Sequence, residues 1–201
     1  MRKMAEETMT IYDEIYEKAK VYLDTRYNDI HVSISYHFAQ RLLSLYPLAD
    51  EDIVLPAILL HDVGWKMVPE EKQLDAFGLD VRDKEAQRFH ETQGAEIAGE
   101  ILRSLDYPEE KIRTIMDIID GHDTRSGALS LNDMLVKDAD KLWRYTLTGV
   151  DIDHARFGIG RSVYTNIIAG LMDKWFFTNE ARMMAAEALS KVRIASEEGS
   201  D

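Results

Sequence analysis

Residues 53–64 read IVLPAILLHDVG, a run of eight apolar residues that leads directly into His61 and Asp62. A helix that is apolar on every face is buried inside a protein. Burying the His–Asp pair at its end costs free energy unless a partner neutralises it, and a divalent metal ion can do so because imidazole and carboxylate are common ligands. Consecutive helical residues point about 100° apart. Both side chains therefore reach one ion only if it lies beyond the helix end, and other segments must supply further ligands.

The composition favours a globular protein in a reducing compartment. Of the 201 residues, 45% are hydrophobic and 30% are charged, a balance typical of soluble domains. The longest apolar run is far shorter than a membrane span, no secretory signal pattern follows Met1, and cysteine is absent. We therefore expect a cytoplasmic protein with neither disulfides nor a membrane partner. The net charge of −13 argues against a nucleic-acid backbone as partner.

Apolar residues recur with helical spacing along nearly the whole chain, and no strand pattern is evident. We expect an all-α fold, a bundle of about eight helices that forms a single domain over residues 1–201. The expected helices cover about 6–27, 28–46, 51–63, 81–105, 108–121, 131–147, 162–177 and 179–195. The core would span about 28–147, with C-terminal helices over 160–196 and a frayed tail over 197–201. Segments 65–80 and 149–160 are expected to be loops able to cover a site.

Four of the six histidines fall on apolar stripes or directly beyond them, namely His31, His61, His90 and His122. His31, for example, begins a stripe that continues through Ile34, Phe38, Leu42 and Leu45. A single inward histidine is most often a hydrogen-bonded core residue. Four of them, accompanied by inward aspartates, favour a metal site.

The helix expected over 131–147 carries two aspartates in its middle, Asp138 and Asp140, and periodicity does not choose between them. Asp140 aligns with Val136 and Trp143, whereas Asp138 aligns with Leu135 and Leu142. Either aspartate can therefore face the core.

His31, the His61–Asp62 doublet and an aspartate that follows alanine, Asp140, resemble the H…HD…D pattern of the HD superfamily of metal-dependent phosphohydrolases. The resemblance extends over about 30–143. It implies a helical HD-type fold and one divalent ion (Mn, Fe, Co, Ni or Mg) held by these four side chains, with Asp138 as the reserve ligand.

The resemblance also implies a role for the other two inward histidines. His90 and His122 correspond to extra ligands in the dinuclear branches of the superfamily, so that a second ion is an option; otherwise they contact substrate. The cyclic-dinucleotide branch has a lysine four residues after the doublet's histidine, where this chain has Trp65 and then Lys66. The downstream signature of that branch is also missing after His122, so that subclass is not favoured.

The implied reaction is hydrolysis of a phosphate ester, on a nucleotide or a similar small molecule, by metal-activated water. Asp62 or its neighbour Asp123 would serve as general base. Four cations near the proposed ligands are candidates to bind the substrate phosphate: Lys141, Lys66, Arg144 and Arg125. Trp65 and Trp143 either stack a base or belong to the core.

Two other readings of the pattern remain open. One is a di-iron oxygenase of the same superfamily, which needs His90 and His122 as ligands. The other is a non-catalytic nucleotide-sensing module. The expected partner in the main reading is a small-molecule phosphate ester, and the oligomeric state, with a homodimer among the options, is left open.

Overall fold

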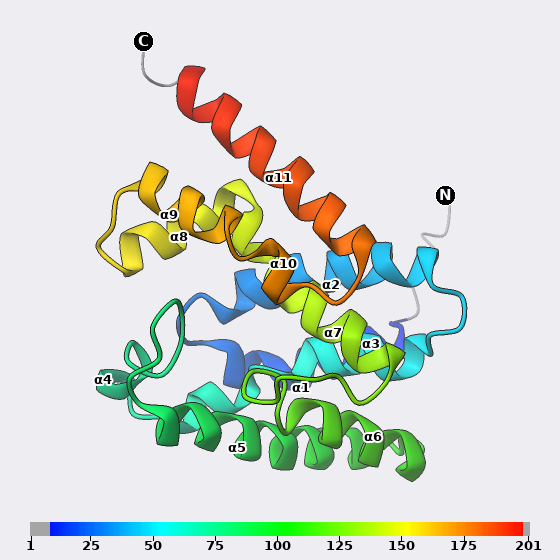
Figure 1. Cartoon of the computed structure of the whole chain (residues 1–201). Helices are drawn as coiled ribbons and strands as arrows, with labels where there is room; N and C mark the ends of the chain where they lie inside the picture. Colours follow the sequence, from blue (N-terminus) through cyan, green and yellow to red (C-terminus); the bar gives the residue numbers. More distant parts are fainter. Residues whose placement is uncertain (1–8, 199–201) are drawn as a thin grey trace, which may run out of the picture.

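The computed structural model describes residues 9–198, with side chains placed as far as residue 195, and this part of the chain is helical without strands (Figure 1). The all-α prediction is confirmed. The α-helices are α1 (Ile11–Leu23), α2 (Asn28–Leu45), α3 (Glu51–Leu60), α4 (Glu70–Gln73), α5 (Lys84–Arg103), α6 (Glu109–Ile119), α7 (Leu131–Leu142), α8 (Leu147–Arg156), α9 (Arg161–Ala169), α10 (Met172–Trp175) and α11 (Asn179–Glu198). Two 3₁₀ helices, η1 (Val63–Met67) and η2 (Trp143–Tyr145), follow α3 and α7. None of the described helices has the length and apolar character needed to cross a lipid bilayer.

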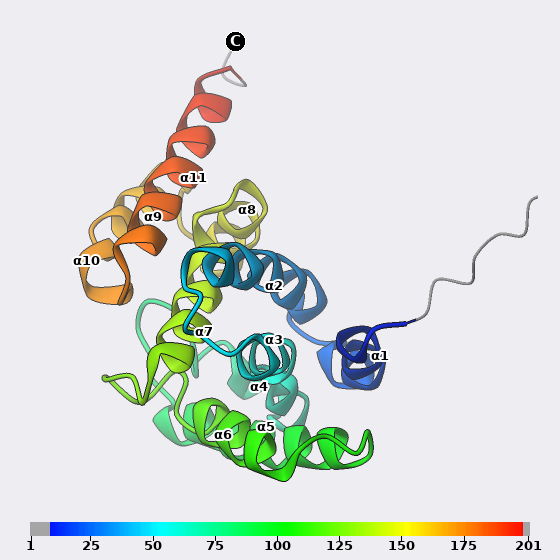
Figure 2. The same cartoon turned by 90° about the vertical axis from the view of Figure 1, so that its right-hand side faces the viewer.

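Helix α3 lies in the middle of the bundle, where α1, α2, α6 and α7 pack around it (Figure 2). All eight residues from Ile53 to Leu60 are buried, as the unbroken apolar run predicts. Asp50 caps the helix, because its side chain accepts a hydrogen bond from the Asp52 amide. The central position of α3 brings its C-terminal end, with His61 and Asp62, among the surrounding helices.

Pro56 lies inside α3 and removes the amide that would bond the carbonyl of Asp52, four residues earlier. The hydroxyl of Tyr107, which lies between α5 and α6, donates to that carbonyl at 2.7 Å. The carbonyl therefore has a partner in spite of the proline, and this explains how a proline is accommodated in a buried helix.

Tyr107→Phe is expected to destabilise the protein by about 1–2 kcal/mol, because it removes the hydroxyl from a part-buried carbonyl. Pro56→Ala restores the backbone donor, so the cost of Tyr107→Phe should shrink in that background. A double-mutant cycle of urea unfolding measures both effects. Equal costs of Tyr107→Phe in the two backgrounds would contradict this account.

Three predictions about α1, α2 and the doublet helix are wrong. Helix α1 ends at Leu23, not near residue 27, while residues 6–8 of the predicted helix lie outside the described part. Leu45 is exposed, because the buried face of α2 runs through Ser35 and Ala39 instead. Gly64 does not end α3; it lies in η1, where a Cβ would approach the carbonyl oxygen of His90 to 1.9 Å. Glycine is therefore required there by the close contact with α5.

Residues 9–198 contain eleven α-helices instead of about eight, because three helices were not expected: α4 lies in the predicted loop 65–80, α8 in the predicted loop 149–160, and α10 is separated from α9 by a break. The predicted loop 149–160 is largely helix α8, which begins after Thr146, whose hydroxyl accepts a hydrogen bond from the Gly149 amide at 3.0 Å. The helix predicted over 162–177 is interrupted at Gly170, a poor helix former, and continues as the one-turn α10. The tail expected from residue 197 is helical as far as Glu198, and its remainder lies outside the described residues.

Candidate metal centre

Four side chains from three helices converge beyond the end of α3. His31 comes from α2, His61 and Asp62 follow α3, and Asp140 comes from α7; all four are buried. His31 Nε2 lies 2.9 Å from His61 Nε2, 3.2 Å from Asp140 Oδ1 and 3.5 Å from Asp62 Oδ2. His61 Nε2 lies 3.6 Å from both carboxylates. These separations suit atoms that share one ion, and we call the four side chains the first ligand group.

Backbone carbonyls orient two of the imidazoles. His61 Nδ1 donates to the carbonyl of Ile58 at 2.8 Å, and His122 Nδ1 donates to that of Ile119 at 2.9 Å. A carbonyl can only accept, so Nδ1 carries the proton and Nε2 of the neutral ring presents a lone pair to the centre. Lone pairs and carboxylate oxygens that face one another repel unless a cation lies between them. The first ligand group therefore fits a divalent ion, and its mixed nitrogen and oxygen donors suit Mn, Fe, Co or Ni.

A second group of potential ligands lies beside the first. His90 Nε2 of α5 is 3.4 Å from His122 Nε2, and Asp123 Oδ2 lies 3.8 Å and 3.9 Å from these two atoms. We call these three side chains the second ligand group. Asp62 lies between the groups, because its Oδ1 is 3.6 Å from His61 Nε2 and 3.7 Å from His122 Nε2. The arrangement can hold two ions with the Asp62 carboxylate between them.

Burial and the neighbouring carboxylates act in opposite directions on the ionisation of these groups. Burial lowers the pKa of His90 to about 4 and also lowers that of His31. Burial also acts to lower the pKa of His122. The neighbouring carboxylates of Asp62 and Asp123 outweigh burial, however, and raise the pKa of His122 to about 10. Burial disfavours the Asp62 carboxylate, yet the surrounding histidines keep its pKa well below the usual range. In the absence of an ion, protons supply part of the positive charge that a bound cation would provide.

The structure distinguishes the two candidate ligands of α7, Asp138 and Asp140. Asp138 is buried on another side of the helix, where its carboxylate accepts hydrogen bonds from the amides of Phe177 and Thr178 at 2.8 and 2.9 Å. Burial raises its pKa to about 6. Although burial also opposes ionisation of Asp140, the ammonium of Lys141 and the histidines keep its pKa well below the usual range. Asp140 therefore faces the ligand groups, and Asp138 anchors the start of α11.

A model of the HD domain family matches residues 28–144, more than half of the chain. The chain belongs to the HD domain family. The matched segment contains both ligand groups and the helices that carry them. No curated protein and no solved structure matches the chain.

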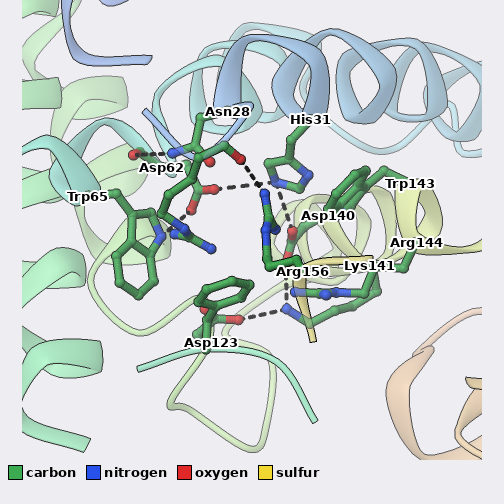
Figure 3. Close-up of a pocket in the computed structure, with 12 residues that line it drawn as sticks. Asn28, His31, Asp62, Trp65, Asp123, Asp140, Lys141, Trp143, Arg144 and Arg156 are labelled. Carbon is green, nitrogen blue, oxygen red and sulfur yellow. Dashed lines mark hydrogen bonds and ion pairs between the residues drawn. The ribbon is translucent and has the colours of Figure 1, made fainter. Parts of the chain in front are cut away.

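Three of the cations that line the cavity over the centre of this HD domain are Lys141, Arg144 and Arg156 (Figure 3). Each of them also has a carboxylate partner. Lys141 Nζ lies between Asp140 and Asp123, at 2.5 and 2.6 Å. Arg144 and Arg156 both pair with the buried Asp153, at 2.5 and 3.0 Å. Lys141 and Arg144 thus lie where the sequence predicted phosphate-binding cations. Arg156 and Asp153 were not among the predicted site residues, because α8 was taken for a loop.

The other two predicted cations lie elsewhere. Lys66 does not line the pocket over the HD centre; its Nζ lies 3.5 Å from Asp24 on the outer side of η1, where its side chain is 40% exposed. Arg125 donates to backbone carbonyls of Asp117 and Asp120 and borders only the neighbouring cavity. The structure thus separates both residues from the ligand groups.

Two further side chains order the HD centre: Glu91, which was not singled out from the sequence, and Trp65, which was expected to stack a base or to belong to the core. Glu91, next to His90 on α5, is fully buried and accepts hydrogen bonds from the amides of Asp123 and Thr124, both at 2.8 Å. It thereby fixes the turn that carries the second ligand group. Trp65 of η1 stacks on His90, with ring centroids 3.9 Å apart, and its indole nitrogen donates to Asp62 Oδ1 at 3.0 Å (Figure 3). A carboxylate directly beside an inward histidine was the only sequence signal for Glu91.

Two cavities adjoin the HD centre. The first opens over the ligand groups and is lined by both predicted and unpredicted residues: Arg26, Asn28, His31, Asp62, Trp65, Phe77, Asp123, Asp140, Lys141, Trp143, Arg144 and Arg156. The second has a volume of about 460 Å³ and shares Asp123, Lys141 and Arg144 with the first. Trp65 and Phe77 come from the segment 65–80, so this segment does border the centre, as expected of a covering loop.

Proposed function

We propose that this HD domain hydrolyses a phosphate ester of a nucleotide or a similar small molecule. The observation that carries the proposal is the convergence of two ligand groups on Asp62 at the floor of a cavity lined by cations. A divalent ion bound there lowers the pKa of a water molecule and withdraws charge from a phosphoryl oxygen. The family assignment supports the same class of chemistry, because HD domains bind divalent metals and are mostly phosphohydrolases.

The proposal gives a role to each member of the two ligand groups and to two of the cations beside them. His31, His61, Asp62 and Asp140 would hold one ion, and His90 and His122, with Asp123 and Asp62, would hold a second. Lys141 and Arg144 bind phosphoryl oxygens, and their carboxylate partners hold both cations in place. Asp123 is the most exposed carboxylate of the centre, at 19% against 9% for Asp62 and 8% for Asp140, and it borders both cavities. When only the first ligand group holds an ion, Asp123 is free to accept the proton of the attacking water, and we assign that role to it.

The second cavity supports a substrate of nucleotide size. Its volume of about 460 Å³ falls in the range of small-molecule sites. Trp175 and Phe177 contribute aromatic faces to its lining, and Lys137 and Lys174 contribute positive charge. A leaving group with an aromatic base can extend there from the ligand groups.

The test is phosphate release from a panel of nucleotides and sugar phosphates by protein loaded with manganese, cobalt or magnesium. We expect turnover with at least one metal and one phosphoester. Folded, metal-loaded protein that turns over none of them would contradict the proposal. Binding of a nucleotide without any turnover would instead support the nucleotide-sensing module.

The second ligand group also favours a second candidate, a di-iron oxygenase, because it gives the chain enough side chains for two ions. The two candidates differ in what they consume. An oxygenase purified without air would contain two irons per chain and take up oxygen with its substrate. The hydrolase releases phosphate with magnesium or manganese and needs neither oxygen nor a change of the metal's oxidation state.

A further inference from the structure

Arg26 lies between α1 and α2, close to the first ligand group. It and Tyr27 adopt left-handed backbone conformations, with φ of 54° and 59°, which turn the chain sharply into α2. The Arg26 side chain lines the cavity over the ligand groups together with His31 and Asp62. The position of Arg26 is therefore set by the turn that leads into α2, the helix that carries His31.

Two aromatic rings hold the guanidinium of Arg26 between them. Its Cζ lies 3.9 Å from the ring centre of Trp65 and 3.7 Å from that of Phe77. Trp65 carries His90 on its other face and is anchored to Asp62. Cation–π contacts of this kind orient a guanidinium but leave its N–H groups free to donate in the plane. The group is thus fixed in place without its hydrogen bonds being used.

Arg26 differs from the other cations that line the cavity. Lys141, Arg144 and Arg156 each have a carboxylate partner, whereas the buried Nε and Nη1 of Arg26 have no hydrogen-bond partner within residues 9–198. A buried cation without a partner is unfavourable. A bound anion would supply the missing acceptors.

The charges around the cavity indicate which anion fits. Four cations (Arg26, Lys141, Arg144 and Arg156) face four carboxylates (Asp62, Asp123, Asp140 and Asp153) in the lining and its direct ion pairs. Histidines that act as metal ligands are neutral, so this set is balanced before an ion binds and each divalent ion then adds a charge of +2. With one or two ions, a dianionic phosphate monoester offsets more of this charge than a monoanionic diester does.

We propose that Arg26 binds the non-bridging oxygens of a terminal phosphoryl group and that the substrates are phosphate monoesters. The proposal rests on the proposed hydrolase function and narrows its substrate class. The planar guanidinium donates two parallel hydrogen bonds to two phosphoryl oxygens. Trp65 and Phe77 are the positioning residues that hold the guanidinium in the orientation needed for these two hydrogen bonds.

The first test measures binding of inorganic phosphate, by calorimetry, to manganese-loaded wild type, Arg26→Met and Arg26→Lys. We expect both variants to bind phosphate at least about 10-fold more weakly, because methionine has no donor and lysine cannot form the bidentate pair. Arg82→Gln, an exposed arginine of the neighbouring loop that pairs with Asp75, is the matched control and should bind like wild type. Undiminished phosphate binding by Arg26→Met would overturn the proposal.

Thermal unfolding separates a binding role from a structural one. Without phosphate, Arg26→Met should unfold at the same temperature as wild type or higher, because it removes an unpaired buried charge. Added phosphate should raise the unfolding temperature of wild type and not that of the variant. A lower unfolding temperature combined with an unchanged phosphate effect would assign Arg26 to the fold. If Arg26→Met does not fold, Arg26→Lys gives the same comparison.

Activity then tests the substrate class. Wild type should hydrolyse p-nitrophenyl phosphate at a higher kcat/KM than bis(p-nitrophenyl) phosphate, and Arg26→Lys should reduce the first value more than the second. A wild type that prefers the diester would refute the monoester assignment and leave the hydrolase function intact. Absence of any turnover would refute the hydrolase function, and phosphate binding would still decide the role of Arg26.

Discussion

Asp140→Asn is expected to remove the ion of the first ligand group and to lower kcat by at least about 1,000-fold, since the metal supplies the nucleophile. The Asp140 carboxylate lies within 3.6 Å of both His31 Nε2 and His61 Nε2. Its replacement by a neutral amide therefore removes the negative charge of this proposed ligand from beside the two histidines. It also removes a partner of Lys141. Metal content by elemental analysis and kcat on the best phosphoester measure the effect.

Asp138→Ala is the matched control for that experiment, because it changes the other aspartate of the same helix. We expect it to keep the metal and to lose about 2–4 kcal/mol of stability, since the amides of Phe177 and Thr178 would lack acceptors. Loss of metal in Asp138→Ala with retention in Asp140→Asn would reverse the assignment of the two aspartates.

His122→Ala is expected to leave one ion per chain where wild type holds two, and to lower kcat by about 100-fold or more. His122 Nε2 lies near His90 Nε2, Asp123 and Asp62, so the second ligand group loses the member that joins it to the first. The first ligand group does not include His122 and should still bind its ion. Metal-to-chain stoichiometry of protein loaded with manganese is the measurement.

His37→Ala provides the control for His122→Ala, because His37 is exposed on α2 and lies outside both ligand groups. It should keep the wild-type metal content and activity. If His122→Ala retained two ions, or if wild type never bound more than one, the dinuclear arrangement would be wrong and His90 and His122 would be left as substrate or supporting groups.

Much of the centre was predictable because its signals are local in the sequence. The eight apolar residues before His61 require a buried helix whatever surrounds it, and His31 and His90 lie in register with core residues of their own helices. Such patterns depend on helical periodicity and on the cost of exposing apolar surface. The caps of α3 and α7, Asp50 and Ser130, are also local, because each side chain accepts a hydrogen bond from an amide two or three residues later.

Other features depend on which helix faces meet, and periodicity carries no information about that. Lys66 follows the doublet in sequence but turns outward with η1, while Arg156 reaches the centre because α8 packs against η2. Helix α8 itself was missed because its apolar face is short and a buried Asp153 occupies one of its inward positions. That aspartate is stable inside because two arginines from different segments pair with it and the hydroxyl of Tyr164 donates to it.

The sequence by itself determined the helical class, the buried helix at the centre of the bundle and the inward-facing histidines, because the hydrophobic effect acts on patterns within a single helix. Periodicity left Asp138 and Asp140 equivalent and the family resemblance favoured Asp140, while the tertiary structure turned Asp140 toward the ligand groups and Asp138 toward α11. The tertiary structure also brought the second ligand group next to the first and placed Arg26 between Trp65 and Phe77, without a carboxylate partner within residues 9–198. These outcomes depend on electrostatic and packing contacts between segments far apart in the chain, whose relative orientation no local pattern encodes.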